Sequence, residues 1–431
     1  MLHIGTFHNI NVGINYKEDT SKLDRLNVEL AKFTALNQKN AALTKLIAAE
    51  QKDIQGKRDR AVYYKRKAYF ELFHCKFKKP CSFGIKDRSG MGSMSRQLIM
   101  QYHENLKNNY MTMWVTDNTI RMYETCDFMP FPLKIKNDVF NLFNGLVGEE
   151  LLVNDKKDIF LLEEEINRTC EIFIKQMWYL SGKNNAVLEY CYNYFAHLVQ
   201  KQGEKPGTAL IVKRIQGIGK NLMFERLVEV LCGEEYLLST TNIDDIVGKF
   251  SSVNRKLMVI LDEVPSEDTY KNCEHLKNFI TSAKVRYERK GVDTVMIKNC
   301  SRAIFLTNND IATKIEQNDR RYQAMEGSSD MANNRSYFDK LLNAFEDKSQ
   351  VKLLYLFFKY RDISKVNMEA DRVQTRLYSE MQSVCSVILY IHAPVHIYGV
   401  TYYSTTTTSD VVVAYKTSGP WNLMLSGHAN Y

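Results

Sequence analysis

The sequence predicts an α/β protein with a largely parallel central sheet, and two observations support that fold class. First, apolar runs with the character of buried strands alternate with helical stretches between residues 208 and 310; the runs are 209–212, 257–261 and 303–307. Second, glycine or polar residues follow each run, at Gly217 to Asn221, Asp262-Glu263 and Asn308-Asn309. Because the carboxyl ends of parallel strands lie at one edge of a sheet, we expect these groups to meet there.

A helical segment is expected over residues 1–67. Residues 21–67 are rich in Lys, Glu, Gln and Ala, and apolar residues recur at helical spacing, at Leu23, Leu26, Leu30 and Phe33. The pattern breaks at Asn37 and Asn40, before three heptads are complete. We therefore favour a helix that packs on its own domain, with a coiled coil as the alternative.

Residues 68–150 are expected to form a small α+β region. Short aromatic segments alternate there with turns that contain prolines, at Pro80, Pro130 and Pro132. Apolar residues alternate over 113–115 and again over 120–123. This alternation predicts a small antiparallel hairpin within the region.

A helical, collar-like segment is expected over residues 151–205, because apolar residues line one face of its second half. Asn184 or Asn185 is the expected N-cap of that helix. The core sheet and its loops then occupy residues 206–345. The last region, 346–431, is expected to contain a helix followed by strands rich in Val, Tyr and Thr.

The loop before residue 220 has the composition of a phosphate-binding loop. Its backbone N–H groups and the N-terminus of the following helix are expected to face the phosphates of a nucleoside triphosphate. The residues expected to bind the nucleotide are Gly217, Ile218, Gly219, Lys220 and Asn221. The Lys220 ammonium group would neutralise phosphate charge, although a solvated lysine at an ordinary helix start is the alternative. Asn221 stands where the usual G-x-x-x-x-G-K-[ST] pattern has a hydroxyl, and its amide oxygen is an expected Mg²⁺ ligand.

Two carboxylates follow the second apolar run. Asp262 is the expected ligand of Mg²⁺, and Glu263 is expected to polarise the water that attacks the γ-phosphate. Carboxylates at the end of a buried strand are costly unless a metal or hydrogen-bond donors compensate them. The alternative is an aspartate that caps a turn. Asn308, after the third run, is the expected sensor of the γ-phosphate, with a simple turn as the alternative.

Two groups of basic residues accompany these motifs. Arg320 and Arg321 are candidate catalytic residues, because in ring-forming NTPases an arginine from one subunit reaches the γ-phosphate of its neighbour. Adjacent arginines are otherwise ordinary surface charge. Residues 284–298 hold five basic and two acidic residues, a local charge of +3, and predict a hairpin with a basic tip. Its expected contacts with nucleic acid are Arg286, Arg289 and Lys290, with a solvated hairpin as the alternative.

Composition limits the classes of protein to which the chain can belong. Of the 431 residues, 45% are hydrophobic and 25% charged, which is enough for a packed core. The net charge of +8 is compatible with nucleic acid without requiring it. None of the 9 cysteines lies in a CxxC pair or a zinc-ligand spacing, so we expect reduced thiols in an intracellular compartment. No apolar run reaches membrane-spanning length, so we expect no membrane partner.

These motifs, in this order and spacing, resemble the superfamily 3 helicases of viruses and mobile elements. The likeness is strongest to the primase-helicase group of poxviruses, giant viruses and phages. It covers residues 185–382 and rests on the GxGKN loop, Leu261-Asp262-Glu263, Thr307-Asn308-Asn309 and Asp319-Arg320-Arg321. The resemblance implies an AAA+-like P-loop ATPase core, a homo-hexamer that moves 3′→5′ on DNA, and a basic hairpin in its channel. Arg214 departs from the family's usual glycine.

The expected function is therefore that of an ATP-dependent DNA helicase, acting on single-stranded or forked DNA in the replication of a virus or mobile element. We recognise no primase module, since the first 150 residues show no paired-carboxylate DxD. The chain is expected to be the helicase part alone, as a fragment or a stand-alone protein in the host cytoplasm or nucleus. Two alternatives are a ring ATPase of the same fold for packaging or remodelling, and a non-catalytic interaction protein with a decayed nucleotide site.

Overall fold

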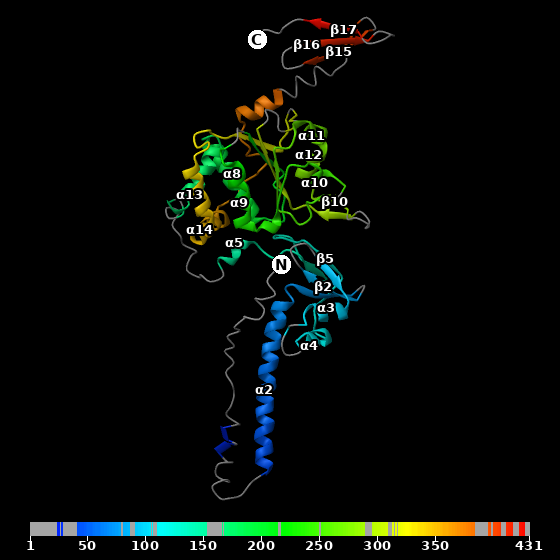
Figure 1. Cartoon of the computed structure of the whole chain (residues 1–431), viewed down its shortest axis with the longest axis vertical. Coiled ribbons are helices and arrows are strands. Elements are labelled where there is room, and N and C mark those ends of the chain that lie inside the picture. The colour runs from blue at the N-terminus through cyan, green and yellow to red at the C-terminus, as the bar shows by residue number, and fades with distance from the viewer. Residues whose placement is uncertain are drawn as a thin grey trace. The chain divides into compact units, whose positions relative to one another are not determined.

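The computed structural model divides the chain into two compact units (Figure 1). The first comprises Met1–Asp127 and Ile135–Leu142, and the second comprises Phe128–Lys134 and Phe143–Tyr431. The residues that the structure describes are 24–25, 27–28, 41–78, 81–86, 91–104, 106, 110–152, 166, 168–213, 217–249, 251–288, 295–308, 313, 315–316, 318–383, 395–397, 400–406, 411–416 and 422–426.

The first unit combines one long helix with a small sheet. Helix α2 (Ala41–Phe70) precedes four strands in the order β3-β2-β1-β4, of which the β1–β4 pair is parallel and the other pairs antiparallel. The strands are β1 (His74–Phe77), β2 (Ser82–Lys86), β3 (Met91–Met94) and β4 (Met122–Tyr123). The unit also contains α3 (Arg96–Tyr102), α4 (Tyr110–Thr116) and the parallel pair of β5 (Thr125–Asp127) and β6 (Val139–Asn141). Helix α2 lies within residues 1–67, where the sequence predicts a helical segment. The four residues of the proposed apolar stripe, Leu23, Leu26, Leu30 and Phe33, lie outside the described residues.

The hairpin expected within residues 113–123 is wrong. Residues 113–115 belong to α4, whose buried face is formed by Tyr110, Met111, Trp114 and Val115. The Trp114 ring is fully buried against Phe70 and Phe83, and its indole N–H donates to Glu71 Oε1 at 3.2 Å. Packing of this one helical face therefore overrides the local alternation.

A pair of histidines is buried in the first unit. His74 Nδ1 lies 2.9 Å from the Phe70 carbonyl oxygen, and His74 Nε2 lies 2.9 Å from His103 Nε2. Because the carbonyl can only accept, Nδ1 of His74 carries a proton and His103 donates to His74 Nε2. Burial lowers the pKa of His74 to about 3, helped by the charge of neighbouring His103, and lowers the pKa of His103 to about 4. Both rings are therefore neutral at about pH 7.

A parallel sheet of five strands forms the centre of the second unit. Its order is β13-β7-β12-β9-β8, and every neighbouring pair is parallel. The strands are β7 (Ala209–Lys213), β8 (Leu237–Thr240), β9 (Met258–Asp262), β12 (Arg302–Thr307) and β13 (Tyr322–Glu326). The chain leaves β7 toward β8 on one side and leaves β12 toward β13 on the other, so the topological switch point lies between β7 and β12. The predicted α/β class with a parallel-rich sheet is confirmed.

Helices cover both faces of this sheet (Figure 1). On one face, α10 (Asp244–Val247) and α12 (Cys273–Thr281) share a buried cluster with the strands, and α11 (Ser266–Lys271) adjoins α12. On the other face pack α7 (Glu171–Leu180), α8 (Asn185–Gln200), α9 (Lys220–Cys232), α13 (Arg335–Glu346) and α14 (Lys348–Tyr360). Shorter elements are α5 (Val147–Glu150) and the 3-10 turn η3 (Glu234–Tyr236). Asn184 caps α8 as expected, since its side chain accepts from the Ala186 N–H at 2.9 Å.

Two antiparallel elements complete the second unit. The expected hairpin is present as β10 (Lys284–Tyr287) paired with β11 (Val295–Lys298). The expected strands of the tail form an antiparallel sheet of β14 (Val395–Ile397), β15 (Val400–Thr406), β16 (Val411–Lys416) and β17 (Asn422–Ser426). All cysteines within the described ranges are free thiols. Of the helices described here, none combines the length and apolar character that a membrane span requires.

Candidate nucleotide-binding site

Three side chains from three different loops meet at the carboxyl edge of the sheet. Lys220 begins α9 after β7, Glu263 follows β9, and Asn308 follows β12. The Lys220 ammonium group donates to Glu263 Oε1 at 2.6 Å and to Asn308 Oδ1 at 2.7 Å. The Asn308 N–H donates to Glu263 Oε2 at 3.1 Å. The structure thus brings together candidate residues from three separate sequence motifs. They meet beside the topological switch point between β7 and β12.

The loop before α9 depends on two glycines with left-handed backbone angles. Gly217 has a φ of 87°, and Gly219, the N-cap of α9, has a φ of 74°. A Cβ on Gly219 would lie 2.4 Å from Phe338 Cε1, and one on Gly217 would lie 2.2 Å from Asn333 Oδ1. Glycine is therefore required at both positions. The first N–H groups of α9 have no partner within the helix, and N–H groups at a helix N-terminus are able to bind an anion. Arg214 lies outside the described residues.

A second contact joins α9 to β9. The Asn221 amide nitrogen donates to Asp262 Oδ2 at 2.5 Å, which leaves the Asn221 amide oxygen outside this contact. Asp262 Oδ1 is buried and has no hydrogen-bond partner among the described residues. A buried carboxylate oxygen without a donor is costly, and carboxylate and amide oxygens are the ligands that Mg²⁺ takes from proteins. These two residues therefore fit a magnesium ion.

Few other protein ligands for a metal are at hand. The described part of the chain contains no cluster of three or more His, Cys, Asp or Glu side chains arranged to hold a metal ion. This argues against a closed protein cage of the kind that Zn²⁺ or Ca²⁺ uses. It suits Mg²⁺, which binds through one or two carboxylates and takes its other ligands from water and substrate phosphates.

Glu263 has a strained backbone. Its φ of 51° lies in the left-handed region, which a residue with a Cβ adopts at a cost of about 1–2 kcal/mol. The Glu263 N–H donates to the Leu306 carbonyl oxygen of β12 at 2.8 Å, and this bond fixes the turn. The turn directs the carboxylate toward Lys220 and Asn308. Strain of this kind persists only where the surroundings impose it, and it is common at functional sites.

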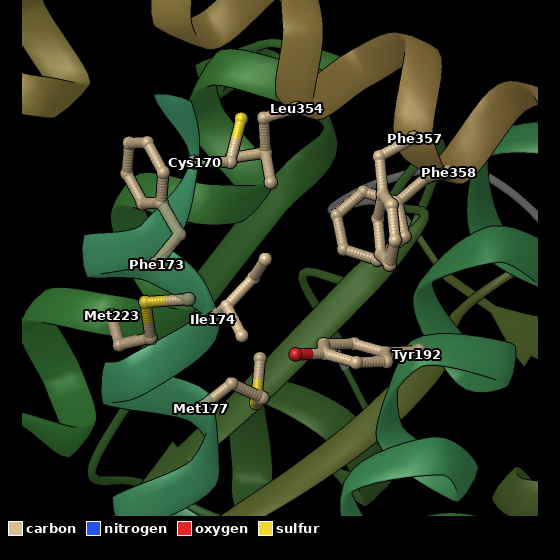
Figure 2. A pocket seen from close by; sticks show the side chains of 9 residues that line it. All are labelled: Cys170, Phe173, Ile174, Met177, Tyr192, Met223, Leu354, Phe357 and Phe358. Carbon is tan, nitrogen blue, oxygen red and sulfur yellow. The ribbon is translucent and has the colours of Figure 1, made fainter. Parts of the chain in front are cut away.

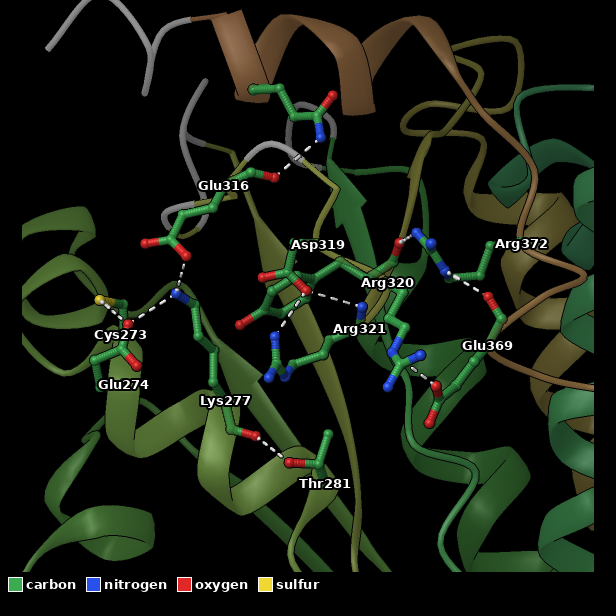
Figure 3. A network of polar contacts seen from close by, with 12 residues as sticks. Cys273, Glu274, Lys277, Thr281, Glu316, Asp319, Arg320, Arg321, Glu369 and Arg372 are labelled. Carbon is green, nitrogen blue, oxygen red and sulfur yellow. Dashed lines mark hydrogen bonds and ion pairs between the residues drawn. The ribbon is translucent and has the colours of Figure 1, made fainter. Parts of the chain in front are cut away.

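Arg320 and Arg321 lie at the opposite edge of the sheet. The residue after Arg321 begins β13 and pairs with Ala209, the first residue of β7. Arg320, whose side chain is 74% exposed, pairs with Glu369 at 3.0 Å, and Arg321 pairs with Asp319 at 3.2 Å (Figure 3). The fold of one chain therefore does not bring either arginine to the loop at the carboxyl edge.

Part of the basic hairpin is described. Arg286 on β10 is exposed and lies opposite Met296 on β11, which is 58% exposed. Arg289 and Lys290, the expected tip, lie outside the described residues. The hairpin itself is thus established, and its contacts with nucleic acid stay a prediction.

Three residues that hold the loop were missed by sequence reasoning. Gln176 on α7 donates from Nε2 to the Ile218 carbonyl oxygen at 2.8 Å. The Asn333 N–H donates to the Gly217 carbonyl oxygen at 2.9 Å, and the Phe338 ring lies against Gly219. For Gln176, the sequence did contain a signal: a glutamine within the apolar face of a predicted helix. Helix α7 buries it together with Phe173, Met177, Tyr179 and Leu180.

A small apolar cavity lies between α7, α8, α9 and α14 (Figure 2). Its lining consists of Cys170, Phe173, Ile174, Met177, Tyr192, Met223, Leu354, Phe357 and Phe358. The Tyr192 hydroxyl points into the cavity and has no hydrogen-bond partner within the described ranges. With a volume of about 10 Å³, the cavity has room for about one water molecule. It is too small for a nucleotide, so the candidate site is the edge of the sheet.

Known proteins match parts of this chain. Residues 213–321 match a family of unknown function, DUF5906, and this segment contains every candidate residue named above from Gly217 to Arg321. The DNA primase-polymerase of Nitratiruptor phage NrS-1 is 30% identical over 138 residues, which are 31% of this chain and 19% of that protein. The match thus spans less than a fifth of the relative's length.

Solved structures of the NrS-1 C-terminal region share the fold. An apo structure of that region has a TM-score of 0.53 at 18% identity, and its A form has a TM-score of 0.53 at 20% identity. Each comparison covers 74% of this chain and 74% of the other. A segment of 138 residues is therefore homologous to part of a phage primase-polymerase, and the chain has the mixed α/β fold of the NrS-1 C-terminal region.

Proposed function

We propose that the chain is an ATP-dependent DNA helicase, a ring translocase of the superfamily 3 type that serves replication of a phage, another virus or a mobile element. The contact of Lys220 with both Glu263 and Asn308, at 2.6 and 2.7 Å, is the observation that carries the proposal. It places one cation between two polar strand ends at a switch point, where α/β sheets bind ligands. The homologous phage protein is named a DNA primase-polymerase, which supports a role in replication.

The arrangement suits hydrolysis of a triphosphate. The N-terminus of α9 would hold the phosphates, and Lys220 would exchange Glu263 for a phosphate oxygen. Glu263, released from that ion pair, would accept a proton from the attacking water at a carboxylate oxygen, and the Asn308 amide would orient the γ-phosphate or the water. Mg²⁺ held by Asp262 and Asn221 would neutralise charge on the phosphates.

A ring of subunits would account for the position of the two arginines. The strands between Arg321 and the phosphate loop are five residues long, so the two ends are about 16 Å apart. That distance exceeds the reach of one arginine side chain. An arginine at this edge would therefore serve the site of a neighbouring subunit, as in other ring ATPases. Light scattering with ATP and Mg²⁺ tests this point, and we expect a homo-hexamer.

The basic hairpin would contact DNA. Replacing Arg289 and Lys290 with alanine should weaken single-strand binding and lower the log–log salt slope by roughly 0.7 for each lost phosphate contact. Basal hydrolysis should survive, whereas its stimulation by DNA and any unwinding should fall together. Arg376→Ala, which removes an arginine whose side chain is 91% exposed, is the matched control. Unchanged unwinding in the double variant would make the hairpin ordinary solvated surface.

The decisive experiment measures hydrolysis and unwinding in the same preparation. We expect Mg²⁺-dependent ATP hydrolysis that single-stranded DNA stimulates, together with displacement of one strand of a forked duplex. Lys220→Ala should abolish both while the chain stays folded, because a lone ammonium group compensates the triphosphate charge at this loop. Lys271→Ala on α11 removes a lysine with a side chain that is 68% exposed, and it should change neither activity.

The other outcomes separate the alternatives. Hydrolysis that DNA stimulates without strand displacement would indicate a packaging or remodelling ATPase of the same fold. A chain that binds no ATP would be an interaction protein with a decayed site. Hydrolysis by Lys220→Ala within a few-fold of wild type would mean that the site is misassigned.

A further inference from the structure

An anion-binding loop has to direct its carbonyl oxygens away from the anion. Its backbone N–H groups bind phosphate oxygens, so each carbonyl of the same loop must find a donor elsewhere or be left unpaired. The Gly219 carbonyl accepts from the Met223 N–H at 3.0 Å, within α9. Among the described residues, the Gly217 and Ile218 carbonyls have their donors on other elements, Asn333 and Gln176.

Gln176 supplies the donor for Ile218. Its Nε2 lies 2.8 Å from the Ile218 carbonyl oxygen, and the assignment of the amide follows because only the nitrogen can donate to a carbonyl. The residue is fully buried in α7, 0% exposed, and its Oε1 has no hydrogen-bond partner among the residues described. A buried amide with one unused oxygen is costly in an apolar helix face, so packing alone does not account for glutamine here.

The same side chain also lies beside the next residue of the loop, Gly219. A Cβ built on Gly219 would lie 3.1 Å from Gln176 Nε2 and 2.4 Å from the Phe338 ring of α13. On the other side, the Asn333 N–H holds the Gly217 carbonyl at 2.9 Å, with Asn333 itself at a φ of 59°. The loop is therefore clamped between α7 and the start of α13, and Gln176 is the one fully buried polar side chain in the clamp.

We infer that Gln176 is a positioning residue for nucleotide binding, which holds the Ile218 carbonyl away from the site so that the neighbouring N–H groups face the phosphates. The inference rests on the proposed function and assigns to it a residue outside the phosphate-loop motif. Without the amide donor, the loop can satisfy the Ile218 carbonyl only by rotating that peptide. Such a rotation would turn the N–H of Gly219 away from the phosphates.

The test compares Gln176→Met with a matched control in the full chain. Methionine has nearly the length and shape of glutamine but no donor. Binding of a fluorescent ATP analogue with Mg²⁺ should weaken about tenfold. The KM for ATP should rise by a similar factor with kcat within about twofold, since Lys220, Glu263 and Asn308 are untouched. Gln176→Glu, an acceptor that adds negative charge beside the loop, should bind still more weakly.

Gln323→Met is the control. Gln323 on β13 is also 0% exposed and donates to two backbone carbonyls, of Ala324 at 3.1 Å and Val373 at 3.2 Å. None of the contacts described for Gln323 involves the loop. Its loss should lower the melting temperature and leave the affinity for the ATP analogue unchanged. If Gln176→Met does not fold, Gln176→Asn keeps the amide and withdraws it by about 1.5 Å. That variant should fall between wild type and the methionine variant.

The outcomes distinguish this inference from the proposed function. A wild-type chain that binds no ATP analogue overturns both. A wild-type chain that binds it, with Gln176→Met and Gln176→Asn within about twofold of that affinity, overturns the role of Gln176 alone. That role is also overturned if Gln176→Met and Gln323→Met lose stability alike and share an unchanged KM. A rise in KM confined to the Gln176 variants supports the inference.

Discussion

Replacing Glu263 with glutamine should slow ATP hydrolysis and at the same time strengthen ATP binding. The reason is the ion pair of Lys220 with Glu263 Oε1, at 2.6 Å. Lys220 has to leave this carboxylate before its ammonium group can bind a phosphate oxygen. A neutral amide at position 263 competes less for Lys220, and it also removes a negative charge beside the γ-phosphate.

The magnitude follows from the burial of the pair. The Lys220 side chain is 6% exposed and the Glu263 side chain 35%, so the pair is intermediate between a fully exposed and a fully buried ion pair. Exposed ion pairs contribute about 0–1 kcal/mol, whereas breaking a fully buried pair costs about 3–5 kcal/mol. An intermediate value of about 1.5 kcal/mol corresponds to about tenfold tighter ATP binding. Hydrolysis should fall about 100- to 1,000-fold, because the carboxylate that accepts the proton is lost.

Equilibrium titration with a fluorescent ATP analogue, alongside steady-state hydrolysis, measures both effects. Glu267→Gln is the matched control, since that side chain is 86% exposed on α11 and pairs only with Lys271 at 3.6 Å among the contacts described for it. It should change neither quantity. Weaker or unchanged nucleotide binding by Glu263→Gln would refute the idea that the ion pair competes with phosphate. Hydrolysis at the wild-type rate would remove Glu263 from the chemistry altogether.

Further predictions concern the metal, the subunit interface and pH. Asp262→Asn should lower Mg²⁺-dependent hydrolysis about 100-fold or more, with nucleotide binding in EDTA little changed; equal Mg²⁺ dependence would exclude Asp262 as a ligand. Chains with Arg320→Ala and Arg321→Ala, mixed with Glu263→Gln chains, should regain hydrolysis that neither has alone, because some interfaces then hold both intact groups. If the double arginine variant forms rings and hydrolyses ATP normally, the trans arginine lies elsewhere. Both buried histidines have lowered pKa values in the folded state, so their contribution to the free energy of unfolding is complete above about pH 6.5. Below that pH the unfolded chain binds the protons first, and each histidine lowers the free energy of unfolding by about 1.4 kcal/mol per pH unit. Thermal unfolding measured between pH 7 and pH 5 should show this loss of stability. His103→Gln should make the dependence of stability on pH shallower, and a variant whose curve runs parallel to that of the wild type would contradict the prediction.

Local pattern predicted those parts of the site that lie on a single strand or loop. The strands β7, β9 and β12 coincide with the predicted apolar runs, because a strand buried on both faces carries polar residues only where it reaches the sheet edge. Gly217 and Gly219 have the positive φ values that the loop requires. The β10–β11 hairpin also followed from alternation within one short segment.

Contacts between distant segments could not be read in the same way. Gln176 precedes its partner Ile218 by 42 residues, and nothing near either residue specifies that contact. Trp114 lies in a segment that alternates like a strand, yet its burial against Phe70 and Phe83 makes the segment a helix. In both cases the local structure is determined by packing against an element that is distant in the sequence.

The two helices that contact the loop, α7 and α13, also pack against each other. Phe173 of α7 packs edge-on against Phe345 of α13 with ring centroids 4.7 Å apart, and the Ser328 N–H donates to the Tyr179 carbonyl oxygen at 2.8 Å. A shift of α7 would therefore change the donor to Ile218 and also the helix that carries Phe338 against Gly219. Close-packed interiors respond to such shifts by exchanging one arrangement for another. Helix α7, which lies within the collar-like segment expected over residues 151–205, thus holds the loop that we propose binds ATP.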